Sequence, residues 1–169
     1  MIRSYKGKEP KVHPTAFVSE AAYVVGDVEI GENSNVWPGA VVRADFGRIK
    51  IGKNTSIEDN SVVHTADEVV IGDDVIIGHN AVVHCRKIGD NTLVGISSVL
   101  LQDAEVGKSC MVAAGALVPP GMKIPDRSLA IGSPARIREQ LSDEKLAVIR
   151  MGADAYADMA REYKAAGYV

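Results

Sequence analysis

Residues 71–84 read IGDDVIIGHNAVVH, and in this stretch an isoleucine or a valine returns every six positions. The same period extends in both directions and covers residues 12–124. Neither the 3.6-residue period of an amphipathic helix nor the two-residue period of a plain strand produces a strict repeat of six. A fixed internal period instead indicates a solenoid, in which successive coils of the chain stack on one another.

The hexapeptide repeat predicts a left-handed parallel β-helix with three faces. Three hexads make one triangular coil, and coils stack at the ordinary inter-strand spacing of about 4.8 Å. The inward-pointing anchors are Val12, Ile30, Ile51, Ile71, Ile88, Val106 and Ile124 on face one, Val18, Val36, Ile57, Ile77, Val94 and Val112 on face two, and Val24, Val42, Val63, Val83, Leu100 and Val118 on face three. The repeat slips only after a third hexad, so we expect loops at one corner to absorb the extra residues.

The repeat fails at Pro125, and a helical pattern follows it. Ser142 is a predicted N-cap because two acidic residues come directly after it, and apolar residues then recur at helical spacing as far as Tyr163. We therefore expect a β-helix domain over residues 1–137 and a C-terminal α-helix within residues 138–169. This helix should lie along the β-helix of its own subunit or of a neighbouring one.

Composition narrows the possible partners. The net charge of -3 and the pI near 5.8 show no basic excess, which argues against nucleic acid and anionic membrane. The sequence has no apolar run of transmembrane length and no apolar signal segment at its start, so we expect a cytoplasmic protein. Cys85 and Cys110 are too few for a disulfide framework, and we expect both to be reduced.

Three histidines fall where a metal ion would need them. Arg43, His64 and His84 each follow a face-three anchor, so they should stand above one another on successive coils and point outward. His64 and His84 would then be about 4.8 Å apart, close enough for both imidazoles to bind one ion. His79 lies on face two, whose outward direction differs by roughly 120° in a triangular coil, so it should reach the same ion only from a neighbouring subunit. Closed three-fold symmetry would set face two of one chain against face three of the next.

Three neutral imidazoles without a fourth protein ligand are typical of an open, catalytic zinc site, in which a bound water is activated near neutral pH. Iron or cobalt could take the place of zinc. Single histidines are common on protein surfaces, but the alignment of two with a third nearby favours a metal site. His13, which follows a face-one anchor far from the others, receives no function.

The segments Arg43-Ala44-Asp45, Asn60–His64 and Gly78–His84 resemble the metal-site motifs of the γ-class carbonic anhydrase family. The hexapeptide repeat and the C-terminal helix are similar to that family along nearly the whole chain. The resemblance implies a zinc-dependent lyase that reversibly hydrates carbon dioxide to bicarbonate by metal-bound hydroxide. It also implies a homotrimer with metal sites at the subunit interfaces, and its metal ligands would be His64, His79 and His84.

The same resemblance assigns further site residues. Arg43 and Asp45 would form an ion pair between subunits, with Arg43 also near bicarbonate, and Tyr156 would reach the site from the terminal helix. A plain interface salt bridge is the structural alternative for Arg43 and Asp45.

The sequence departs from the best-known active members in three places. Glu58 stands where they carry a Gln, and Phe46 where they carry a Glu. Their long acidic loop with a proton-shuttling Glu is also missing, because only residues 65–70 separate His64 from the next anchor. Hydration requires a proton to leave at each turnover, so a missing shuttle predicts slow catalysis or none. Glu58 could instead orient bound water or act as base, or it could be a solvated or interface carboxylate.

Other functions remain open on the sequence. The segment Gly132-Ser133-Pro134-Ala135-Arg136 resembles one at the end of the acyltransferase β-helices that use acetyl-CoA. Those enzymes usually rely on a single catalytic His, so the trio favours the metal site. A metal-dependent thioesterase acting on a CoA ester and a catalytically weak assembly subunit are further alternatives. Cys85 is expected to be structural, and Trp37 to lie in an interface.

Overall fold

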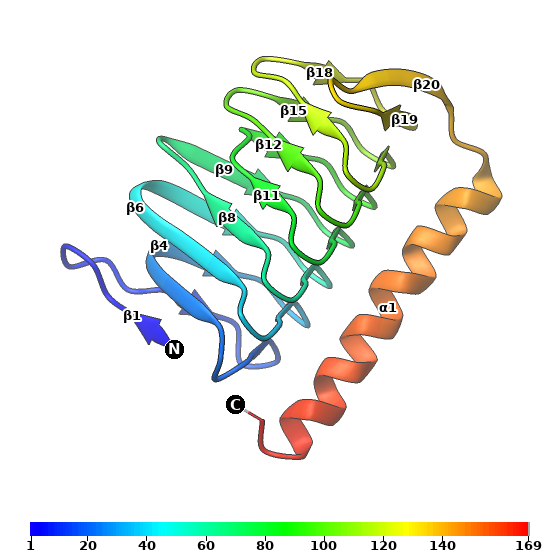
Figure 1. The fold of residues 1–169 in the computed structure, drawn as a ribbon. Helices are drawn as coiled ribbons and strands as arrows, with labels where there is room; N and C mark the ends of the chain where they lie inside the picture. Colours follow the sequence, from blue (N-terminus) through cyan, green and yellow to red (C-terminus); the bar gives the residue numbers. More distant parts are fainter. Residues whose placement is uncertain (169) are drawn as a thin grey trace.

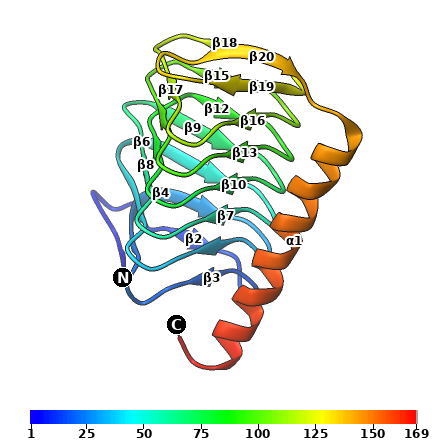
Figure 2. The ribbon, with the colours of Figure 1, turned by 45° about the vertical axis from the view of Figure 1, so that its right-hand side comes forward.

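The computed structural model describes residues 1–168 and confirms a left-handed parallel β-helix with one C-terminal helix (Figures 1 and 2). Face one consists of β2 (Lys11–Val12), the end of β4 (Tyr23–Ile30), the end of β6 (Val41–Ile51), β9 (Glu68–Ile71), β12 (Lys87–Ile88), β15 (Glu105–Val106) and β18 (Lys123–Ile124). Face two consists of β3 (Phe17–Val18), β5 (Asn35–Val36), β7 (Ser56–Ile57), β10 (Ile76–Ile77), β13 (Leu93–Val94), β16 (Met111–Val112) and β19 (Ser128–Ile131). Face three consists of β1 (Ile2–Arg3), the starts of β4 and β6, β8 (Val62–His64), β11 (Val82–Val83), β14 (Val99–Leu100) and β17 (Leu117–Val118).

The aliphatic anchors form the core, as the repeat predicts. Every anchor from Val24 to Ile124 is at most 3% exposed. The coils pair in the predicted register, with Val63 opposite Val83 on face three. Most strands are only two residues long, but a strand in the middle of the stack hydrogen-bonds to the coil below and the coil above. Stability therefore comes from stacking and not from any single strand.

The corner between faces three and one differs from the prediction at one of its slips. Between Val42 and Ile51, β6 continues through the corner as one extended strand in place of a loop. Residues 44–47 of this strand pair with neither β8 nor β9, and pairing resumes where Arg48 lies opposite Glu68. At the next slip, residues 65–67 form a short connection outside the strands, as expected.

The corner between faces two and three is made by residues in the left-handed conformation. Asn60, Asn80 and Ser97 occupy successive coils there with φ of 59°, 58° and 57°. Asparagine tolerates this conformation better than most residues because its short polar side chain bonds locally. These corner residues fix the direction of the two or three residues that precede them, among them His79.

The C-terminal segment begins with a strand that the sequence analysis did not predict. β20 (Arg136–Gln140) pairs antiparallel with β19 and caps the last coil. The expected boundary after residue 137 therefore falls inside a strand. Ser142 is the N-cap of α1 (Asp143–Ala165), as predicted, and its side chain accepts a hydrogen bond from the backbone N–H of Lys145.

Helix α1 lies along face two of its own chain (Figure 1). Leu146 and Ile149 are buried against Leu93 and Met111 of that face. The helix runs back toward the first coils, where Lys164 Nζ donates hydrogen bonds of 2.6 and 2.9 Å to the backbone carbonyl oxygens of residues 14 and 16. The described part of the chain contains no helix with both the length and the apolar character needed to cross a membrane.

Trp37 lies beneath this helix and not at a subunit interface, so its expected position is wrong. It is 5% exposed and packs against Phe17, Tyr156 and Tyr163. Its indole N–H donates a 2.6 Å hydrogen bond to Asn35 Oδ1. The hexapeptide register places it correctly on the outside of face two, but the register alone does not reveal that α1 covers that face.

An aspartate in the centre of the stack should prevent folding. Val94 is fully buried, so Val94→Asp places an unpaired carboxylate in the core at a cost of several kcal/mol. We expect this variant to be insoluble or to lose its cooperative thermal transition in circular dichroism. Val148→Asp, at a position of α1 that is 66% exposed, is the matched control and should melt near the wild-type temperature. A folded, cooperative Val94→Asp protein would contradict the coil assignment.

Candidate metal centre

His64 and His84 stack on face three. Each directly follows a buried anchor, and the two anchors pair in register on β8 and β11. Their ring centroids are 5.3 Å apart and their planes differ by 27°. Arg43 lies opposite His64 on the preceding coil. The rings of His64 and His84 therefore stack as the register predicts, and Arg43 occupies the same strand position on the preceding coil. We call these three residues the column.

Asp45 connects Arg43 and His64 through its two carboxylate oxygens. Its Oδ1 lies 3.0 Å from His64 Nε2, while its Oδ2 forms an ion pair with Arg43. Desolvation raises the pKa of Asp45, but hydrogen bonds from His64 and Arg43 outweigh it and hold this pKa below its usual value. Arg43 and Asp45 of the same chain therefore form an ion pair with each other. It orients His64 from below.

Phe46 stands beside the column on the solvent side. It is 77% exposed, and its ring is edge-on to His64 with centroids 6.1 Å apart.

His79 lies at the corner between faces two and three, between two carboxylates. Its Nε2 is 3.0 Å from Glu58 Oε2, and its Nδ1 is 3.1 Å from Asp59 Oδ2. Glu58 Oε2 also accepts a 3.0 Å hydrogen bond from the backbone N–H of His79. The Glu58 side chain is 5% exposed, whereas that of Asp59 is 41% exposed.

His79, Glu58 and Asp59 form a second group, and Tyr156 of α1 lies next to it. Burial, and then the hydrogen bond and charge of Glu58, raise the pKa of the Tyr156 hydroxyl above its usual value. The phenol therefore stays protonated and can act as a hydrogen-bond donor to Glu58. The sequence analysis placed Tyr156 near the site by resemblance, and the structure brings it to Glu58 and His79.

The column and the second group, which contains His79, are separate within one chain. Among residues 1–168, no three side chains of His, Cys, Asp or Glu are placed so that they could hold a metal ion together. His64 and His84 project from face three, whereas His79 belongs to the end of face two. The imidazoles of both groups suit zinc, iron or cobalt by their chemistry, but one chain contributes only a partial set of ligands.

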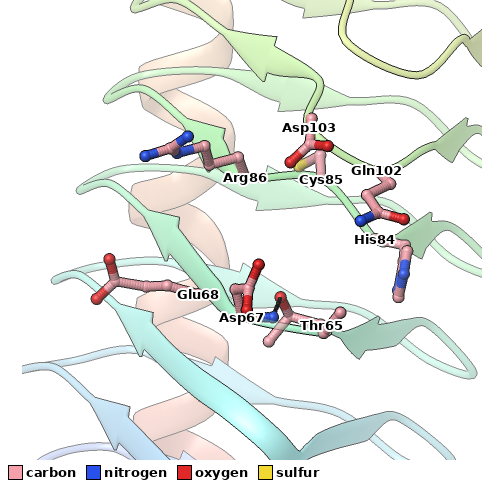
Figure 3. Close-up of a pocket in the computed structure, with 9 residues that line it drawn as sticks. Thr65, Asp67, Glu68, His84, Cys85, Arg86, Gln102 and Asp103 are labelled. Carbon is pink, nitrogen blue, oxygen red and sulfur yellow. Dashed lines mark hydrogen bonds between the residues drawn. The ribbon is translucent and has the colours of Figure 1, made fainter.

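A polar cleft of about 140 Å³ adjoins His84 (Figure 3). It is lined by Thr65, Ala66, Asp67, Glu68, His84, Cys85, Arg86, Gln102 and Asp103. Figure 3 shows Asp67 and Asp103 pointing toward the space between their coils, while Glu68 and Arg86 extend away from it. The sequence analysis missed Asp67 and Asp103, as well as Asp59. A count of carboxylates at the two corners that flank the histidines would have found them.

Comparisons with known proteins place this chain in a family. A family model described as "Hexapeptide repeat of succinyl-transferase" matches residues 87–119. The chain is 41% identical over 166 residues to Gamma carbonic anhydrase 1, mitochondrial, of Arabidopsis thaliana, covering 94% of this chain and 60% of that protein. It is 36% identical to a Carbonic anhydrase of Geobacillus kaustophilus, covering 98% and 92% of the two chains. It is also 35% identical to the Carnitine operon protein CaiE of Escherichia coli K12, covering 92% and 81%.

Two solved structures are similar throughout but carry other names. A hexapeptide transferase family protein from Anaplasma phagocytophilum has a TM-score of 0.93 at 36% identity, covering 96% of this chain and 98% of that one. A putative acetyltransferase of Bacillus cereus has a TM-score of 0.95 at 33% identity, covering 98% and 97%. The chain spans about three fifths of the length of the Arabidopsis relatives.

Cys85 should be inert in the native protein, although it adjoins His84 and the cleft. Burial raises the pKa of its thiol to about 12, so at pH 8 only about one thiol in ten thousand is ionised. We expect an aromatic disulfide reagent to leave Cys85 unmodified until denaturant is added. The test uses Cys110→Ser, because Ser or Thr stands at this inward position on other coils and Cys85 is then the single thiol. Rapid stoichiometric labelling of that folded variant would contradict the structural role of Cys85.

Proposed function

The chain belongs to the γ-class carbonic anhydrase family of hexapeptide-repeat proteins, and from this premise we propose that it is a zinc-dependent enzyme that hydrates carbon dioxide reversibly to bicarbonate. We further propose that it acts as a homotrimer. His64 and His84 of one chain and His79 of the next would hold the metal ion at each subunit interface.

The observation that carries this proposal is the placement of the histidines. Two imidazoles stack 5.3 Å apart on face three, and a third projects at the end of face two. A three-fold assembly that sets these two faces against each other unites the partial ligand sets, and it creates identical sites. In this assembly the neighbouring subunit would also cover the exposed Phe46 ring beside His64.

The zinc ion, when bound, would supply the Lewis acidity that lowers the pKa of a bound water to about 7. The side chains around it have separable roles in this proposal. Asp45 orients His64, and Arg43 offers a positive charge to the bicarbonate product. Tyr156 keeps its proton and donates to Glu58. Proton release would pass to Asp67 or Asp103 of the adjoining cleft or directly to solvent, since the long acidic loop is missing.

Acyl transfer from a CoA ester is the second candidate function. It is supported by the names of the two similar solved structures and of the matching family model. The metal-dependent thioesterase is closer to the first candidate, because the same activated water could attack a thioester carbonyl. The stacked His64 and His84 favour the metal enzymes, because an acyltransferase of this fold needs one histidine base and gains nothing from the pair.

Mixed trimers test whether the metal site is shared. We expect His79→Ala chains and His64→Ala/His84→Ala chains to form metal-free, inactive trimers when each is expressed alone. Co-expressed with two different affinity tags and purified through both, they should regain metal and carbon dioxide hydration, because each variant supplies the ligands that the other lacks. Zinc per trimer is measured by plasma mass spectrometry, and hydration by stopped-flow pH change.

His13→Ala is the matched control, because His13 lies on face one and should leave metal content and hydration at wild-type levels. Mixed trimers that fold normally but contain no more metal than the separate variants would show that the ligands come from a single chain. Metal recovery without hydration would retain the shared site and reject carbon dioxide as the substrate.

Acetyl-CoA separates the two candidate functions. If the metal enzyme is correct, titration calorimetry of the zinc-loaded protein with acetyl-CoA should show no saturable binding at micromolar concentrations. Saturable micromolar binding that survives removal of the metal with a chelator would instead support the acyltransferase.

A further inference from the structure

A groove of about 380 Å³ runs along the outer surface of face two, beside Tyr156 of α1. Most of its wall is apolar, and the apolar side chains that line it include Ile76, Leu93, Ile96, Met111, Ala113 and Ala114. Ile76, Leu93 and Met111 lie opposite one another on β10, β13 and β16, so the groove spans three coils. Two inter-coil spacings of about 4.8 Å give it a length of roughly 10 Å.

The polar side chains of the groove gather at one end. Glu58, His79 and Tyr156 line that end, where Glu58 Oε2 lies 3.0 Å from His79 Nε2. The lining residues at the other end, Met111 and Ala113, are apolar. A ligand that fits this distribution has a polar head at His79 and an apolar tail along face two. The Glu58 carboxylate would repel a second carboxylate, so the head should be neutral.

The size of the groove suits an organic ligand. Sites for small organic molecules have volumes of about 300 to 1,000 Å³ and combine mainly hydrophobic walls with a few polar groups. The groove has both properties. Carbon dioxide, with three heavy atoms, would leave most of this space empty. A longer ligand would also remove from water the side chain of Ile96, which is 51% exposed at the edge of the groove.

We propose that this groove binds the acyl chain of a neutral ester, with the ester carbonyl at His79 and the apolar chain along face two. Carbon–carbon bonds of about 1.5 Å advance an extended chain by roughly 1.3 Å per carbon, so the groove holds a chain of about eight carbons. Binding in the groove needs no metal ion.

Hydrolysis of the bound ester would be a second activity, and this part of the inference rests on the proposed shared metal site. The hydroxyl of a water molecule forms a new bond to the acyl carbon, and the bond from that carbon to the alcohol oxygen breaks. The alcohol leaves with the electron pair of the broken bond and takes up the second proton of the water. The other product is the carboxylic acid, which loses its proton to solvent.

Methyl ketones of increasing chain length test the binding site, because they keep the neutral carbonyl and the apolar chain but cannot be hydrolysed. Their affinity for the assembled wild-type protein is measured by titration calorimetry, with zinc and after its removal. We expect each added methylene to raise the affinity about four-fold. The affinity should stop rising when the chain has about eight carbons, because further methylenes lie outside the groove in water.

Ala114→Trp blocks the groove, since Ala114 is an exposed residue of its lining. We expect the affinity for the long ketones to fall by on the order of 10-fold, as the loss of about two buried methylenes would produce. Ala21→Trp is the matched control, because Ala21 is exposed at the same corner of the first coil, away from the groove. Native mass shows whether each variant assembles, and Ala113→Leu, which fills the groove from its floor, replaces Ala114→Trp if the latter does not.

Nitrophenyl esters test the second activity. The zinc-loaded wild-type protein should hydrolyse the octanoate with a higher kcat/KM than the acetate, and Ala21→Trp should keep this preference. Ala114→Trp should lose it, because the long chain no longer has its site.

The outcomes separate this inference from the proposed function. Carbon dioxide hydration without ketone binding would overturn the acyl site and leave the proposed function intact, because a neighbouring chain would then fill the groove. Ketone affinity that rises without a limit, or that Ala114→Trp leaves unchanged, would also overturn the site. Length-limited ketone binding by a protein that hydrates no carbon dioxide would support the site and reject the proposed function. Ketone binding without ester hydrolysis by the zinc-loaded protein would support the site and overturn the second activity.

Discussion

The in-register hydrogen bonding between successive coils is the constraint on which the rest of this structure depends. It forces residues at the same hexad position to lie one strand spacing apart, whatever their side chains. Inside the coil the result is a continuous column of aliphatic anchors. Outside, the same rule places His64 and His84 in contact, although nineteen residues separate them in the sequence. The candidate site is therefore a consequence of the repeat and needs no additional scaffold.

The triangular cross-section of the β-helix separates the three histidines, because His64 and His84 lie on face three and His79 lies at the end of face two. His79 belongs to a corner that is turned by the left-handed residue Asn80, and there it meets Glu58, Asp59 and Tyr156. One chain thus presents an imidazole pair with an orienting carboxylate, Asp45, and separately a third imidazole between two carboxylates. Within residues 1–168, neither group offers three ligands placed to hold a metal ion. A divalent cation between subunits would complete them together, which would link metal binding to assembly.

The sequence was sufficient for the core, the three faces and the histidine column, because strict periodicity determines register and register determines which residues are neighbours. It was insufficient where contacts are not periodic. The burial of Trp37 depends on a helix more than a hundred residues away, and the extended course of β6 through its corner is a backbone feature that the side-chain pattern does not encode. Glu58 was noted as a departure from the family, but its burial and its 3.0 Å contact with His79 Nε2 required coordinates.

The central claim is that two chains share each metal ion, and a crystal structure of the zinc-loaded protein with anomalous diffraction at the zinc edge tests it most directly. The account predicts three equivalent anomalous peaks per trimer, each between His64 and His84 of one protomer and His79 of its partner. Peaks located within a single chain, or at residues other than these histidines, would contradict it.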